Sequence, residues 1–111
     1  MLLADGSVFT LGGSWEEKDS FGGKDGEIWT PESNAWSLLP GIKALPMQTE
    51  DQKGPYRSDN HMWLFQAPNG RVFQAGPSKQ MHWIDVRGEG SSWQSVLRGD
   101  DDDAMCATAT M

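Results

Sequence analysis

The sequence is poor in cysteine, in basic residues and in long apolar runs. A single cysteine among 111 residues excludes an internal disulfide framework and a four-cysteine zinc site. Nine lysines and arginines stand against 16 acidic residues, and the net charge of −7 disfavours nucleic-acid binding, which needs a basic surface. No apolar run approaches the roughly 20 residues that cross a bilayer. We therefore expect no nucleic-acid partner and no membrane partner.

Tryptophan and glycine are plentiful by contrast, with six and 13 copies. Short alternations of apolar and polar residues, bounded by glycine, proline and asparagine, predict β-strands and no helix. The predicted strands are residues 7–11, 26–31, 35–40, 60–66, 71–75, 80–86, 92–97 and 104–111. Five tryptophans are expected to pack within the resulting sheets: Trp29, Trp36, Trp63, Trp83 and Trp93.

An internal repeat runs through the chain. Residues 5–9 (DGSVF) match residues 69–73 (NGRVF), and Gly12 matches Gly76, all at an offset of 64. Four strands per unit with glycine and aromatic landmarks are typical of β-propeller blades, and kelch units run about 50 residues. A propeller needs four or more blades to close its ring. The sequence therefore predicts about one and a half blades of four-stranded antiparallel sheet, a piece of a larger all-β protein.

The repeat divides the chain into four parts. Residues 1–40 are predicted to hold the last strands of one blade, and residues 60–98 one complete blade. Residues 41–59 between them are rich in proline, glycine and charge and lack periodicity, which predicts a long inter-blade loop. Residues 99–111 are expected to form an acidic turn and the first strand of the next blade.

Four runs follow one another along the chain: residues 4–15 (ADGSVFTLGGSW), 56–65 (YRSDNHMWLF), 72–78 (VFQAGPS) and 103–106 (DAMC). In this order and at these separations they resemble the galactose oxidase family of fungal, secreted copper-radical oxidases. The resemblance covers essentially the whole chain and implies a seven-bladed kelch propeller. It also implies a secreted location, although residues 1–5 reach a charge too early for a complete signal peptide.

The resemblance also implies a chemistry. In the family, copper is held by two tyrosines and two histidines, and one of the tyrosines is bonded to a cysteine and carries a radical. Together they oxidise a primary alcohol to an aldehyde and reduce O₂ to H₂O₂. The family's ligands correspond to positions before Met1 and beyond Met111, so this chain is expected to match no copper ligand and to be inactive alone.

Two positions of the family's site carry over by resemblance, and a third lies next to one of them. Trp15, which closes GGSW, corresponds to the tryptophan that stacks on the cross-linked tyrosine; its alternative role is blade packing. Arg57 of YRSDNH corresponds to the substrate-facing arginine, whose planar donors suit sugar hydroxyls; its alternative is a solvated loop cation. Tyr56 is a candidate lining residue.

The other candidates favour structural interpretations. His61 and His82 are 21 residues apart without ligands at metal spacing, so a metal site there is not expected. Residues 100–103 are four aspartates, interpreted as a solvated turn because the alternating oxygen ligands of a calcium loop are missing. Two functions stay open: part of an alcohol oxidase acting on a primary alcohol or sugar and O₂, or a non-catalytic kelch module that binds protein or glycan through its loops.

Overall fold

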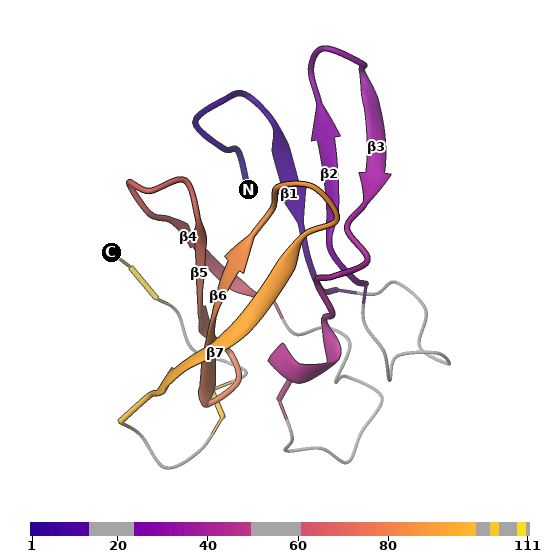
Figure 1. Cartoon of the computed structure of the whole chain (residues 1–111). Helices are drawn as coiled ribbons and strands as arrows, with labels where there is room; N and C mark the ends of the chain where they lie inside the picture. Colours follow the sequence, from indigo (N-terminus) through magenta and orange to yellow (C-terminus); the bar gives the residue numbers. More distant parts are fainter. Residues whose placement is uncertain (14–23, 50–60, 100–102, 105–108, 111) are drawn as a thin grey trace.

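Two antiparallel sheets make up the part of the chain that the structure describes (Figure 1). The structure is a computed structural model, and it describes residues 1–13, 24–49, 61–99, 103–104 and 109–110. The first sheet has the order β1-β2-β3: β1 (Val8–Thr10), β2 (Glu27–Thr30) and β3 (Ala35–Leu38). The second has the order β4-β5-β6-β7: β4 (Trp63–Gln66), β5 (Val72–Gly76), β6 (Gln80–Asp85) and β7 (Ser91–Leu97). The all-β expectation is confirmed.

The core is built from residues of both sheets and of the segment that follows β3. Phe9 of β1, Val72 of β5 and Ile84 of β6 are all fully buried in one apolar cluster. On β5 the buried and half-buried residues alternate, as expected for a strand with one face on a core. No helix among the described residues is long and apolar enough to cross a membrane.

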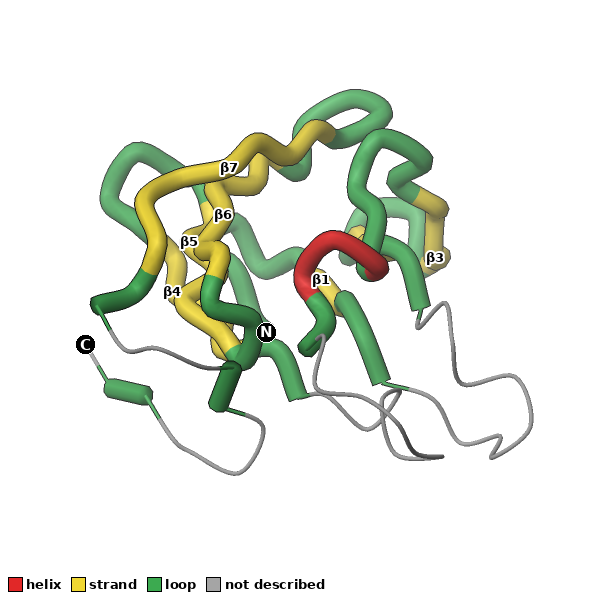
Figure 2. The backbone as a smooth tube through the Cα atoms, turned by 90° about the horizontal axis from the view of Figure 1, so that it is seen from below, coloured by secondary structure: helices red, strands yellow, loops and turns green. Residues whose placement is uncertain are grey.

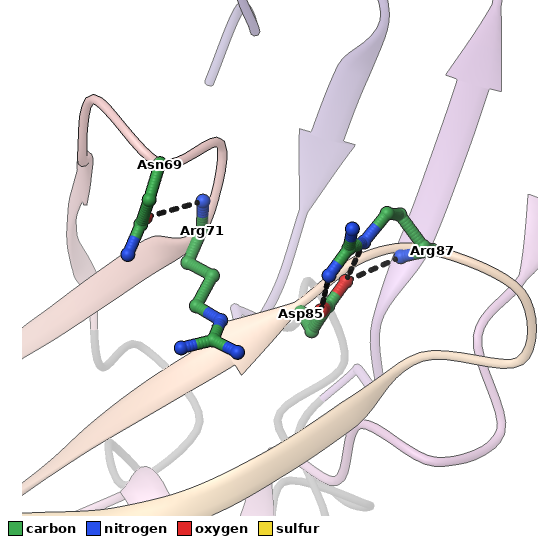
Figure 3. A network of polar contacts seen from close by, with 4 residues as sticks. All are labelled: Asn69, Arg71, Asp85 and Arg87. Atoms are coloured by element: carbon green, nitrogen blue, oxygen red, sulfur yellow. Dashed lines mark hydrogen bonds and ion pairs between the residues drawn. The ribbon is translucent and has the colours of Figure 1, made fainter.

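The internal repeat is visible at the level of single hydrogen bonds. Two hairpin turns are closed by the same three bonds, and each partner in one turn lies 64 positions from its counterpart in the other. In the first turn the bonds run from Leu3 N to Ser7 O (2.8 Å), Gly6 N to Leu3 O (3.0 Å) and Ser7 N to Asp5 Oδ1 (2.9 Å). In the second turn they run from Ala67 N to Arg71 O (2.8 Å), Gly70 N to Ala67 O (3.0 Å) and Arg71 N to Asn69 Oδ1 (3.0 Å; Figure 3). Residues 1–3 therefore occupy the place beside β1 that the end of β4 occupies beside β5.

The segment after β3 differs from the irregular loop that its composition predicts. It contains a 3-10 turn, η1 (Leu45–Met47), with proline in its first turn. Ile42 and Met47 are fully buried in the core, and η1 lies against β6. In Figure 2 this turn lies between the strands of the two sheets. Apolar residues of this segment thus fill the space between the sheets. The segment has no periodic pattern from which its burial could be predicted.

The tryptophans follow the packing expectation only in part. Trp29, Trp63 and Trp83 are half-buried, but Trp36 and Trp93 are 54 % and 39 % exposed. The expectation is wrong for these two because all of β3 and most of β7 are exposed. Trp93 instead lies beneath the Arg71 guanidinium, whose carbon is 5.1 Å from the ring centroid.

Residues 103 and 104 are bonded to the β5–β6 hairpin. The Lys79 N–H donates to Asp103 Oδ1 (2.6 Å), and the Ala104 N–H donates to the Pro77 carbonyl (2.9 Å). Asp103 is therefore more than part of a solvated turn, whereas residues 100–102 lie outside the described residues. Of the strand expected over residues 104–111, the described residues 104 and 109–110 are not in a strand, and the rest lie outside the description.

A buried polar network holds the same hairpin from within. His82 Nδ1 lies 2.8 Å from Gln74 Oε1, and the Gln74 amide donates to the Gly76 carbonyl (2.8 Å) and to Ser78 Oγ (3.2 Å). Because Gln74 Oε1 is only an acceptor, His82 carries its proton on Nδ1. His82 therefore serves as a bonded core residue, in line with the structural interpretation of its sequence context.

We expect acid to weaken the fold through His82. Burial lowers the pKa of His82 below its ordinary 6.5, so the unfolded chain binds a proton that the folded chain resists. The stability that His82 contributes is full above about pH 6.5 and is lost as the pH falls below that value. Urea unfolding at pH 7.5 and 5.5 should show this loss in the wild type and a smaller one in His82→Gln. Equal losses in the two proteins would contradict it.

Candidate functional site

The ends of two segments that carry candidate residues meet at one place. Gly12 and His61, far apart in sequence, form an isolated antiparallel bridge. Gly12 and Gly13 have φ angles of 77° and 76°, in the left-handed region that glycine adopts without strain. These two residues end the path of β1, and His61 leads into β4. The bridge thus brings GGSW and YRSDNH together at their described ends.

A hollow of about 260 Å³ lies beside this bridge. It is lined by both glycines of the pair, by His61 and Met62, and by the β1 side of the first sheet, including Phe9. The lining is mostly apolar, with the His61 imidazole and Thr10 as its polar side chains. Small-molecule sites commonly combine an apolar wall with a few polar groups, so this hollow is the candidate site.

The three residues predicted for the site lie outside the described residues: Trp15, Tyr56 and Arg57. In the sequence Trp15 follows Gly13 by two positions, and Arg57 precedes His61 by four. The structure therefore describes Gly12 and Gly13 of the first motif and His61 of the second. The roles of the three side chains stay predictions.

Copper, the metal that the family resemblance implies, does not fit the donors of this hollow. Its lining offers one imidazole, one hydroxyl and the thioethers of Met1 and Met62, and it includes no tyrosine. Among all described residues, no group of three or more histidine, cysteine, aspartate or glutamate side chains could hold a metal ion. No chemical step is therefore assigned to a metal within the described part of the chain.

A second polar feature, an ion pair, lies at the turn between β6 and β7. Asp85 and Arg87 form an ion pair in which Arg87 Nε donates to Asp85 Oδ1 over 2.8 Å (Figure 3). The hydrogen bond from Arg87 lowers the pKa of Asp85 to about 2. The carboxylate is therefore ionised at any physiological pH, which suits a structural turn and excludes a role as general acid.

Sequence reasoning missed two buried polar residues. Gln48 and Thr49 follow η1 directly and are 2 % and 0 % exposed. Gln48 Nε2, Gln48 Oε1 and Thr49 Oγ1 have no hydrogen-bond partner among the described residues. Glutamine and threonine in an aperiodic stretch give no sequence signal, and only the fold shows that they are buried and unpaired.

Comparison with known proteins shows which sequences and structures this chain is similar to. Two curated sequences named galactose oxidase, both from Gibberella zeae, are 47 % identical over 116 aligned positions that cover 98 % of this chain. A solved copper complex, described as a novel fungal alcohol oxidase of the AA5 family, matches 95 % of this chain with a TM-score of 0.79 and 39 % identity. No family model matches the chain. The chain spans 16 % of the length of the curated relatives and 21 % of the solved chain. In sequence and in fold, the chain is a galactose-oxidase-like segment.

Proposed function

We propose that this chain is part of the catalytic propeller of a copper-radical oxidase that converts a primary alcohol, of the galactose type, into an aldehyde. The similarity to galactose oxidase over nearly the whole chain carries the proposal. The Gly12–His61 bridge supports it, because it draws together the two segments that bear Trp15 and Arg57. The overall reaction transfers two electrons and two protons from the alcohol to O₂, which becomes H₂O₂.

The copper and its tyrosine–cysteine cofactor supply the redox chemistry in the intact oxidase, and their ligands lie in parts of it that this chain does not include. Arg57 orients the substrate by paired hydrogen bonds from its guanidinium to sugar hydroxyls. Trp15 covers the aromatic cofactor ring and keeps solvent away from it. Tyr56 lines the same site.

The proposed architecture follows the repeat. Residues 1–40 belong to one kelch blade, residues 41–59 connect it to the next, residues 60–98 form that blade, and residues 99–111 lead into a third. The matching hairpin bonds at an offset of 64 support this division. The proposed location of the intact oxidase is secreted.

A chimera tests the oxidase proposal. Residues 1–111 replace the matching segment of Gibberella zeae galactose oxidase, and the copper-loaded protein is assayed for H₂O₂ with galactose. We expect peroxide from the chimera and none from the 111-residue chain with copper, because the chain matches none of the family's copper ligands. A folded chimera without activity would instead favour a non-catalytic kelch module, and peroxide from the chain alone would overturn its expected inactivity.

A further inference from the structure

The outer face of the second sheet, turned away from the core, carries a row of aromatic side chains. The strand register places Phe65, Phe73, Trp83 and Trp93 directly opposite one another on β4, β5, β6 and β7. Directly opposed residues share one face of a sheet, and the Phe73 and Trp83 ring centroids are 4.8 Å apart. The first three residues of the row are half-buried and Trp93 is 39 % exposed, whereas Val72 on the opposite face is fully buried. The described residues therefore cover this aromatic row only in part.

The internal repeat shows what covers a face of this kind. Phe9 of the first sheet is the counterpart of Phe73 at the offset of 64. Phe9 is fully buried, and it packs in the core with Val72 and Ile84 on the inner face of the second sheet. In the first sheet, the face that corresponds to the aromatic row thus packs on a neighbouring sheet. The aromatic row therefore fits a sheet face of the same kind as the one that bears Val72 and Ile84.

The chain offers such a face on the outer side of its first sheet. Val8 is the counterpart of Val72, and the register places Trp29 opposite Val8 and Trp36 opposite Trp29. These side chains point away from the core that contains Phe9, since neighbouring residues of a strand point to opposite sides. Trp36 is 54 % exposed, and Val8 and Trp29 are half-buried. The two outer faces of one chain are therefore the two halves of the packing that already joins its sheets.

We propose that the chain binds a second copy of itself head to tail, with the aromatic row of one copy on the outer face of the first sheet of the next. The contact does not rest on the proposed oxidase function. Because the two surfaces differ, the contact is heterologous and repeats from copy to copy instead of stopping at a dimer. Burial of apolar side chains drives it. The net charge of −7 opposes it, so added salt should strengthen the association.

Sedimentation of the 111-residue chain over a range of concentrations tests the association, and we expect an average mass that rises past that of a dimer. Trp93→Glu disables the aromatic row and Trp36→Glu disables the other face, because each places a carboxylate in the apolar contact. In either variant the apparent dissociation constant should rise at least about tenfold, which corresponds to about 1.4 kcal/mol. An equal mixture of the two variants should form a dimer and nothing larger, because one intact face of each kind remains.

Leu45→Glu is the matched control. Leu45 is 52 % exposed and lies on η1, outside both faces, so this variant should associate like the wild type. Trp93→Ser and Trp36→Ser must give the same results as the glutamate variants, and urea unfolding checks that each variant keeps its fold.

Three outcomes overturn the proposal. The first is a wild-type chain that stays monomeric up to about 1 mM. The second is a loss of association in only one of the two glutamate variants, or a mixture of the two that stays monomeric, since either result means that the two faces do not pair with each other. The third is an equal loss in Leu45→Glu, which would indicate an effect of added charge alone.

Discussion

Changing Arg57 to alanine in the chimera is expected to lower kcat/KM for galactose by about 100-fold. A hydrogen bond from a charged donor contributes about 1.5–3 kcal/mol, and loss of a bonded pair removes about 3 kcal/mol, or two factors of ten. Most of the loss should be in KM if the arginine holds the substrate equally in the ground state and the transition state. Peroxide release, measured over a range of galactose concentrations, separates kcat from KM.

Two controls accompany this variant. Arg71→Ala removes an arginine of the β4–β5 turn that lies over the Trp93 ring, so kcat/KM should stay within about twofold of the wild type. Arg57→Lys keeps the charge but loses the planar pair of donors, and should recover only part of the activity. Full activity in Arg57→Ala would remove Arg57 from the site, and an equal loss in Arg71→Ala would indicate a general effect on folding.

The change Gly41→Ala is expected to lower the free energy of unfolding by about 3 kcal/mol. A Cβ atom at Gly41 would lie 2.0 Å from the Gly90 carbonyl oxygen and 2.8 Å from its carbon, and backbone cannot move aside as a side-chain end can. The Gly41 N–H also donates to the Glu89 carbonyl (3.0 Å), which ties the segment after β3 to the β6–β7 turn. A methyl group here forces the two sheets apart.

Urea unfolding of Gly41→Ala and Gly99→Ala provides the measurement. A Cβ atom at Gly99 would meet no described heavy atom within 4 Å, so this substitution should change stability by less than about 0.5 kcal/mol. If both variants unfold at the same urea concentration as the wild type, the close approach of the Gly41 and Gly90 backbones does not hold in solution.

The strands were predictable because their signal is local. Residues 71–75 alternate and end near a glycine, and the structure places β5 at Val72–Gly76. The duplicated hairpin was also visible in the sequence, since turn residues such as Asp5-Gly6 and Asn69-Gly70 specify their own backbone geometry.

What could not be predicted depends on contacts between distant parts of the chain. Nothing in the residue types near Ile42 and Met47 says that this aperiodic segment fills the core, because burial there is decided by two sheets that close over it. Trp36 is likewise exposed together with the whole of β3, and residue type does not encode which strand is left uncovered. The motifs named Trp15 and Arg57 as site candidates, whereas the burial of the unpaired Gln48 amide emerges only from the fold.

The Gly12–His61 bridge has a consequence for the order of folding. The β2–β3 and β5–β6 hairpins join strands that are neighbours in sequence through short loops, which close at little entropic cost. The bridge instead closes a loop of nearly half the chain, and contacts of such long range form after local ones. We therefore expect the hollow beside the bridge to form later in folding than the short-loop hairpins.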